Sequence, residues 1–383
     1  MSKNDRRPKY RVHLLGLAHT KTSKEFSHCA YTMKVLKMGK MLTDLGHTVF
    51  HYGAEGSDLQ CTEHITCVTD AEQAYTYEDK NWPNVIFNPD YTNDLAYKKF
   101  NERAIAEINK RGQPRDMLLC SMGIAQKGIA DKVGIMAVEM GIGYTGTFAE
   151  YRVFESYAWM SYIYGMQMPS SVACDGKNYD CVIPNYFDPD DFEFSDKKED
   201  YLLYMGRLTP RKGVNIAYET AKRTGMKLKI AGAGKLEDVQ IPDNDPLVEY
   251  VGSVGVKDRS DLMKNARAIM VPTIYLGPFE GVAVEAMMCG TPAITSDFGV
   301  FPETVQHGKT GYRCRTLEQF VWAVKHAGEL DHKYIRDYAL NNYSLERVGK
   351  MYSEYFYQLQ GLFGKGWYED NLKRKELDWL RKY

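Results

Sequence analysis

Two cations follow a strand-like run in the segment YLLYMGRLTPRKG, at a spacing that suits a diphosphate. The apolar run predicts a buried strand, and Gly206 lets the chain turn at its carboxyl end, where open α/β sheets bind ligands. Arg207 and Lys212 are then expected to lie in that crevice. Taken alone, the pair fits two surface charges on a strand-to-helix loop at least as well.

A second segment, GPFEGVAVEAMMCGTP (277–292), predicts a Gly/Pro loop that leads into a helix. The first turn of a helix presents backbone N–H groups without intrahelical partners, and here these groups run from about Gly281 to Ala283. Glu285 falls one turn inside the helix, where its carboxylate can accept hydrogen bonds from two ribose hydroxyls. In isolation, an acid favoured by the helix dipole would explain Glu285 as well.

The elements that must position these residues alternate between short β-branched runs and helical patterns, which is typical of parallel sheets covered by helices. In the first half we expect strands near 10–17, 48–52, 84–88, 116–120, 134–139 and 180–183, with helices at 30–45, 97–110, 124–132 and 150–165. A second series begins at residue 201, with a helix from Val214 to Arg223, another at 258–266 and strand-like runs between them.

The chain therefore divides into two α/β domains, because 383 residues exceed the size at which one hydrophobic core stops growing. The Pro-rich and acidic stretch 182–201 reads as the linker. We expect a Rossmann-like N-terminal domain at 1–189, joined by 362–383, and a Rossmann-like C-terminal domain at 190–361. Two long helices are expected after residue 344.

Composition excludes several classes of protein. Hydrophobic residues make up 44% of the chain, charged residues 26%, and the net charge is −1, the balance of a globular protein that does not attract polyanions. No stretch reaches the length of a membrane span and no signal-peptide core follows the N-terminus, so a cytoplasmic protein without an integral membrane segment is expected. The eight scattered cysteines indicate reduced thiols rather than a zinc site.

Together the motifs resemble family-4 glycosyltransferases and their relatives of the GT-B fold. The resemblance spans nearly the whole C-terminal half and rests on NYFDPDDF (185–192), GRLTPRKG (206–213), YVGSV (250–254), GPFEGVAVEAMMCGTP (277–292) and HGKTGY (307–312). It implies an α/β fold of two Rossmann-like parallel-sheet domains facing a cleft, with a C-terminal helix returning to the N-terminal domain. The C-terminal domain would bind a nucleotide-sugar donor, whose nucleotide would be UDP or GDP.

The same resemblance assigns roles to residues. Arg207 and Lys212 would neutralise the β-phosphate of the leaving group, and Glu285 would hold the ribose. Other donor contacts would come from the loops and the helix that carry these motifs: Gly206, Gly252, Val254, Gly277, Phe279, Gly281 and Val282. These families transfer with retention of configuration and need no metal, so no cofactor is expected.

One departure from the family pattern concerns the donor sugar. The family places a glutamate eight residues before the ribose glutamate, and that position here is Gly277. Glu280, in the same loop, could supply the carboxylate from a shifted position and is counted with Arg207 and Lys212 as a catalytic candidate. It could equally be an N-cap or an exposed acid.

The N-terminal half should carry the acceptor, and its candidates follow the ends of expected strands. They are His19, His28 and Glu139, with Glu155 ranked below Glu139 because it could simply stabilise packing in a helix. The acceptor itself stays open among glycan, protein, lipid and nucleic acid. Asp188-Pro-Asp190 and Asp243-Asn-Asp245 have the spacing of metal-binding DxD triplets, but their Pro-rich surroundings indicate turns.

Two other functions remain. A GT-B epimerase would bind the same groups and act on the nucleotide-sugar without an external acceptor. A sugar-nucleotide sensor without catalytic activity would be consistent with Gly277, although the presence of Arg207, Lys212 and Glu285 argues against it.

Overall fold

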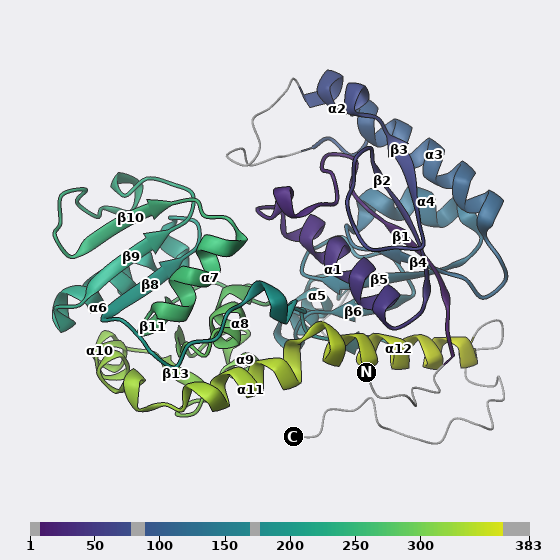
Figure 1. Ribbon diagram of the computed structural model, residues 1–383. Helices are drawn as coiled ribbons and strands as arrows, with labels where there is room; N and C mark the ends of the chain where they lie inside the picture. The colour runs from purple at the N-terminus through teal and green to yellow at the C-terminus, as the bar shows by residue number, and fades with distance from the viewer. Residues whose placement is uncertain (1–7, 78–88, 169–176, 363–383) are drawn as a thin grey trace. The chain divides into compact units, whose positions relative to one another are not determined.

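The computed structural model describes residues 8–77, 89–168 and 177–362, which form two compact units (Figure 1). Of these residues, the first unit contains those up to Phe154, residues 177–183 and the helix that begins at Leu345. The second unit contains residues 155–168 and Pro184–Ser344.

A parallel sheet forms the centre of the first unit, with seven strands in the order β3-β2-β1-β4-β5-β6-β7. Its strands are β1 (Arg11–Leu15), β2 (Thr48–Ala54), β3 (Glu63–Val68), β4 (Met117–Cys120), β5 (Met136–Ile142), β6 (Tyr151–Phe154) and β7 (Cys181–Val182). Strand β4, in the middle of the sheet, is apolar along its whole length, as expected where helices cover both faces of a sheet. All four residues of β4, MLLC, are buried.

Helices flank this sheet: α1 (Ala30–Asp44), α2 (Asp70–Tyr77), α3 (Leu95–Arg111), α4 (Ile124–Val133) and α12 (Leu345–Leu362), with a short turn of 3-10 helix, η1 (Lys24–Phe26). The last of the described helices, α12, packs against α1 (Figure 1). Gly349 lets the two helices approach, because a Cβ there would stand 2.7 Å from Cγ of Met41. A hydrogen bond of 2.9 Å joins Nε2 of His47 to Oγ of Ser353.

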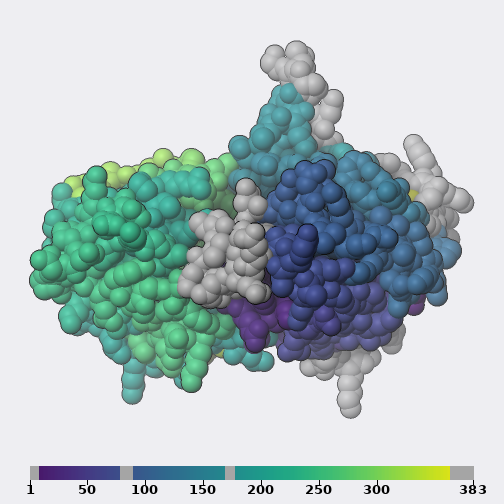
Figure 2. All heavy atoms as spheres, turned by 90° about the horizontal axis from the view of Figure 1, so that it is seen from above, coloured from purple at the N-terminus to yellow at the C-terminus, as the bar shows by residue number. Residues whose placement is uncertain are grey.

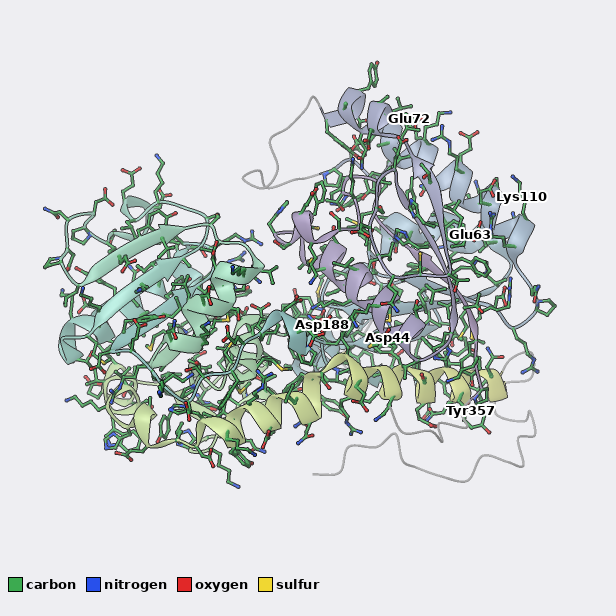
Figure 3. The ribbon with its side chains drawn as sticks, viewed as in Figure 1. Asp44, Glu63, Glu72, Lys110, Asp188 and Tyr357 are labelled. Atoms are coloured by element: carbon green, nitrogen blue, oxygen red, sulfur yellow. The ribbon has the colours of Figure 1, made fainter. Side chains whose placement is uncertain are left out.

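Ion pairs connect the elements at the β3 edge of the first unit, where Figure 3 labels Glu63 and Glu72. Glu72, on α2, accepts two hydrogen bonds from Arg103 of α3, at 2.6 and 2.7 Å. Glu63, at the start of β3, pairs with Arg111 at 2.6 Å. These pairs join α2 and the edge strand to α3.

The second unit contains a parallel sheet of six strands in the order β10-β9-β8-β11-β12-β13. Its strands are β8 (Tyr201–Met205), β9 (Lys227–Ala231), β10 (Val248–Gly252), β11 (Ala268–Val271), β12 (Ala293–Ser296) and β13 (Gly311–Cys314). From β8 the chain adds β9 and β10 on one side of the sheet, and then returns to add β11, β12 and β13 on the other side. The strand order therefore reverses at β8, and ligands of such sheets bind at the carboxyl ends of the strands at this reversal point.

The helices of this unit are α5 (Tyr157–Gln167), α6 (Val214–Thr224), α7 (Val256–Asn265), α8 (Gly281–Met288), α9 (Phe301–Thr304), α10 (Leu317–His326) and α11 (His332–Tyr343). Short 3-10 turns complete it: η2 (Pro189–Asp191), η3 (Pro210–Lys212), η4 (Glu237–Val239) and η5 (Ala327–Glu329). One hydrophobic cluster lies between the sheet and α6 and α10, and another between the sheet and α7, α8 and α11. Figure 2 shows the outer surface of this unit, in teal and green, seen from above.

The structure confirms the two parallel-sheet domains and most of the expected elements, and corrects one helix. Residues 150–165 are not a single helix, because YRVF (151–154) pairs with β5 and β7 as strand β6. Helix α5 begins only after Ser156, whose side chain accepts the N–H of Trp159. Strand β3 and helix α2 were not expected, and the expected strand at 84–88 lies outside the described residues.

The two compact units differ from the expected division at 189/190 in three places, the smallest of which is that the second unit already resumes at Pro184. Residues 155–168 belong to the second unit, where the Glu303 carboxylate accepts the N–H groups of Tyr157 and Ala158 at 2.9 and 2.8 Å. Helix α12 belongs to the first unit, although residues up to 361 were assigned to the second domain. The expected contribution of 363–383 falls outside the described residues.

None of the described helices is both long enough and apolar enough to cross a bilayer.

Candidate active site

The turn between β8 and α6 holds the first pair of candidates. Gly206 continues the sheet through an N–H bond to Ala231 O at 2.9 Å, and the hydroxyl of Tyr204 donates to Arg207 O at 3.0 Å. Gly213 ends η3 in the left-handed conformation, with φ of 74°. A Cβ at Gly213 would lie 2.0 Å from Pro272 O, so both its φ and its surroundings require glycine. The backbone of this turn is therefore fixed.

Arg207 and Lys212 differ in their partners. The side chain of Arg207 is exposed and, within the described residues, makes no hydrogen bond or ion pair. Lys212 donates to both carboxylate oxygens of Glu280, at 2.8 and 2.7 Å. Its Nζ also lies 5.1 Å from the ring centre of Tyr275, over which Arg211 sits at 4.7 Å. Arg207 is thus ready for an incoming anion, whereas Lys212 already has one.

Glu280 occupies an unusual backbone position at the start of α8. Its φ and ψ are both 56°, the left-handed region that few residues other than glycine adopt. Its side chain makes no capping hydrogen bond and is only 5% exposed. Glu280 is therefore the N-cap residue of α8 by position, although its side chain does not cap the helix, and it is not an exposed acid.

Gly277 and Glu280 share one small volume. A Cβ built on Gly277 would stand 2.2 Å from Oε1 of Glu280 and 3.0 Å from its Cδ. The Glu280 carboxylate thus lies where a side chain at position 277 would begin. This geometry explains how a carboxylate can be present in the loop without a glutamate at 277.

The first turn of α8 offers fewer free amides than the sequence suggested. The N–H of Ala283 donates to Glu280 O at 3.2 Å, which leaves those of Gly281 and Val282 without a backbone partner among the described residues. Phe279 is 2% exposed and packs between Phe187 and Tyr343. Only its backbone can therefore face a ligand.

Glu285 lies one turn into α8, as expected, and its carboxylate already has a cationic partner. Nη1 of Arg259, on α7, lies 3.3 Å from each of its two oxygens. The Glu285 side chain is 16% exposed and that of Arg259 is 25% exposed. Nothing in the sequence distinguished Arg259 from the other basic residues of its helix.

The turns after β9 and β10 lie beside Gly206. Gly232, with φ of 141°, would place a Cβ 2.0 Å from Gly206 O, so the two strand-end turns are in close contact. The N–H of Gly232 donates to Gly252 O at 2.8 Å. Tyr250 covers this turn, with its hydroxyl 3.0 Å from Gly232 O and 2.7 Å from Gly234 O. Gly252, and after it the partly buried Val254, therefore lie next to the turn at Gly232, which in turn contacts Gly206 and so lies near Arg207.

The histidine candidates of the first unit are not equivalent. His19 is 6% exposed, and its Nδ1 shares a hydrogen bond of 2.7 Å with the hydroxyl of Tyr97. Burial, with a smaller contribution from His28, lowers the pKa of His19 to about 3, so its ring is neutral at pH 7. Burial also lowers the pKa of His28. Both residues follow β1, but His19 has the more enclosed ring.

Glu139 is a structural carboxylate of the β5–β6 connection. It is fully buried, and it accepts the N–H groups of Phe148 and Ala149, both at 2.8 Å, and the hydroxyl of Tyr144 at 3.2 Å. Burial raises its pKa, against the effect of these donors. Its contacts are those of a group that shapes a loop, and Glu155 is likewise buried.

Gln126 of α4 is a residue that the sequence analysis missed. Its Oε1 accepts the N–H groups of Ser121 and Met122, at 2.8 and 3.1 Å, and its Nε2 donates to Gly16 O at 3.0 Å. It therefore joins the loop that follows β4 to the loop that follows β1, and the latter leads to His19 and His28.

The two DxD triplets contain the turn-forming residues that the sequence indicated. Asp188, labelled in Figure 3, accepts the N–H of Asp190 at 3.2 Å and caps η2. Asp245 accepts the N–H of Leu247 at 2.9 Å and the hydroxyl of Tyr218.

Two Rossmann-like parallel sheets, with a last helix that returns to the first unit, define the GT-B class of fold. Solved structures support this class: sucrose-phosphate synthase from Thermosynechococcus elongatus superposes with a TM-score of 0.67 at 16% identity, covering 92% of this chain and 99% of that one. Anabaena HepE, described as a complex with UDP-glucose, superposes with a TM-score of 0.61 at 14% identity, covering 90% and 98%.

The family follows from the sequence of the second unit. Residues 188–339 match the family described as "Glycosyl transferases group 1", so this segment is a glycosyltransferase domain of that family. An uncharacterized glycosyltransferase of Methanocaldococcus jannaschii is 30% identical over 156 residues, which are 38% of this chain and 39% of that protein. The chain thus matches well under two thirds of that relative's length.

Proposed function

We propose that the protein is a retaining glycosyltransferase, which transfers a sugar from a nucleoside diphosphate to an acceptor hydroxyl without a metal ion. One observation carries the proposal: Arg207, which is exposed and has no partner among the residues that the structure describes, lies in the same fixed turn of the glycosyltransferase domain as Lys212. Backbone amides of Gly281 and Val282, at the N-terminus of α8, supply further positive potential.

The donor is proposed to be a UDP- or GDP-sugar. The diphosphate would bind Arg207, Lys212 and the amides of α8, and the ribose would bind Glu285. The base would meet the backbone from Gly252 to Val254. The UDP-glucose described for Anabaena HepE supports a uridine nucleotide as the first candidate.

Retention is proposed to follow from substitution on the face from which the diphosphate departs. The bond between sugar C1 and the β-phosphate oxygen breaks, and both of its electrons go to the phosphate. The acceptor oxygen forms the new bond to C1 and gives its proton to that phosphate oxygen. The protein would stabilise the charge that develops on the diphosphate, which is the largest single effect in many enzymes.

Lys212 can stabilise the diphosphate only if its ammonium group interacts with the phosphate as well as with Glu280. The two side chains are paired before any donor is present, and a diphosphate brings further negative charge to the same ammonium group. We propose that Glu280 then turns toward the hydroxyls of the donor sugar, for which the family places a glutamate at the position of Gly277.

Donor turnover in the presence of EDTA tests the proposal. UDP-, GDP- and ADP-sugars are incubated with the full chain, with and without candidate acceptors, and nucleotide release and the sugar product are measured. We expect release of one nucleotide in EDTA, because cationic side chains and amides carry the charge stabilisation. Activity that appears only with Mn²⁺ would contradict the metal-independent step, and an altered sugar without any acceptor would indicate an epimerase.

Glu285→Ala should weaken donor binding rather than slow the chemical step. The ribose contact is present in the ground state and the transition state alike, so its loss raises KM and leaves kcat nearly unchanged. The expected cost is about 1.5 to 3 kcal/mol for a hydrogen bond to a charged group. Steady-state kinetics with the preferred donor measure it, and a lowered kcat at unchanged KM would contradict the role.

Gly277→Ala should destabilise the protein through Glu280. The new Cβ would meet Oε1 of Glu280 at 2.2 Å, so the carboxylate must leave Lys212 or the loop must move, at a cost of about 1 to 3 kcal/mol. The same change in a Glu280→Gly background should cost much less, because the obstructing side chain is gone. Urea unfolding of the four proteins in this cycle measures the coupling.

The exchange Gly277→Glu with Glu280→Gly then tests whether the two positions supply one carboxylate. We expect the double variant to retain more turnover than Glu280→Gly alone, and glycine at 280 also relieves the left-handed backbone strain. Additive unfolding costs in the first cycle, together with no recovery of turnover here, would show that Glu280 does not replace a side chain at 277.

A further inference from the structure

The ion pair between Arg259 and Glu285 is incompletely formed. A guanidinium and a carboxylate that fit well make two parallel hydrogen bonds from two nitrogens, at about 2.7 to 2.9 Å. Here a single nitrogen, Nη1, reaches both Glu285 oxygens at 3.3 Å. Nε of Arg259 is buried and has no hydrogen-bond partner in the described part of the chain.

The elements around the pair hold Arg259 beside the proposed nucleotide site. Arg259 lies in the first turn of α7, where its N–H donates to Gly255 O at 2.9 Å, directly after the turn that contains Gly252 and Val254. Helices α7 and α8 pack together, and Met263 of α7 lies in the core cluster that contains Ala286 of α8. The Arg259 side chain therefore reaches Glu285 from a rigid helix.

We propose that Arg259 is a positioning residue, which holds the Glu285 carboxylate in the orientation that accepts the ribose hydroxyls of the donor. The inference rests on the proposed function and adds a residue to the nucleotide site. Long contacts from one nitrogen leave lone pairs of both Glu285 oxygens available, so the ribose hydroxyls can donate without displacing Arg259. Without the cation, the mostly buried carboxylate loses its only partner among the described residues and is free to rotate about its side-chain bonds.

The experiment compares nucleotides that differ in one ribose hydroxyl. UDP and GDP, with their 2′-deoxy and 3′-deoxy analogues, are titrated into the full chain by calorimetry. In the unaltered protein, loss of a hydroxyl bound by Glu285 should weaken binding roughly 10- to 100-fold. Arg259→Met keeps the aliphatic stem, and should reduce this discrimination to about threefold or less because the carboxylate is no longer aimed. Arg259→Lys should restore part of it.

Two further variants separate positioning from stability. Lys264→Met, on the same helix, removes ion pairs with Glu193 and Asp261 without touching Glu285, and should leave the discrimination unchanged. In a Glu285→Ala background, Arg259→Met should have no further effect on it. Donor kinetics should show a raised KM and a nearly unchanged kcat for Arg259→Met.

The outcomes also distinguish this inference from the function on which it rests. If the nucleotides bind and Glu285→Ala abolishes the discrimination, but Arg259→Met leaves it intact, then Arg259 only joins α7 to α8 and the inference is wrong. If neither UDP nor GDP binds the folded, unaltered protein, the proposed donor site itself is wrong.

Discussion

Arg207→Met should lower the rate of sugar transfer about 10²-fold, the effect of removing one preorganised donor from a charge-stabilised transition state. The free energy of unfolding should change by no more than about 0.5 kcal/mol, because exposed side chains without special contacts contribute little. The Arg207 side chain is exposed and has no partner within the described residues, so no contact there gives it a stabilising role. Single-turnover rates and urea unfolding measure the two effects separately.

Arg223→Met serves as the matched control for Arg207. Arg223 lies at the far end of α6, its side chain is 50% exposed, and its one ion pair with the described residues is a 3.4 Å contact with Glu318. It should alter neither the transfer rate nor the stability. An Arg207 variant as active as the Arg223 variant would remove Arg207 from the site.

Lys212→Met should reduce both stability and turnover. Removal of one partner from a fully buried ion pair typically costs about 3 to 5 kcal/mol, so this partly buried pair should lose no more than that. The Glu280 side chain is only 5% exposed and loses both of its short contacts with Lys212. Turnover should also fall about 10²-fold through the loss of the phosphate cation. Denaturant unfolding and donor kinetics measure the two losses.

The double variant Lys212→Met with Glu280→Gln separates the two effects. The amide removes the uncompensated charge, so most of the lost stability should return, whereas turnover should stay low. Recovery of turnover together with stability would mean that Lys212 acts only as the partner of Glu280. In that case the cationic role would pass to Arg207 alone.

Much of the fold can be predicted from local sequence patterns, and the elements that were not predicted have physical reasons for it. Buried parallel strands such as YLLYM are apolar throughout, so β8 and its neighbours could be predicted. Strand β3 lies at the sheet edge and is only partly buried. It begins with Glu63 and His64, so it lacks the continuous apolar run that marks a buried strand. The YRVF strand was assigned to a helix although Ser156 has the signature of an N-cap two residues later.

The candidate site was predictable where it consists of strand-end turns and less so where it depends on side chains from distant segments. The turn at Gly206 and the first turn of α8 follow from glycines next to apolar runs. The pairing of Lys212 with Glu280 joins residues 68 positions apart, and that of Arg259 with Glu285 joins residues 26 apart, so spacing could reveal neither. The left-handed backbone of Glu280 is set by the surrounding loop and not by its own preference.

Binding of a nucleoside diphosphate to the full chain tests the central claim most directly. UDP, GDP and ADP are titrated in turn by calorimetry in a buffer that contains EDTA, with circular dichroism to confirm that the protein is folded. We predict that UDP or GDP binds at one site per chain, and that Arg207→Met and Glu285→Ala each weaken this binding. Absence of binding by all three nucleotides to the folded protein would contradict the assignment of a nucleotide-sugar site to the second unit.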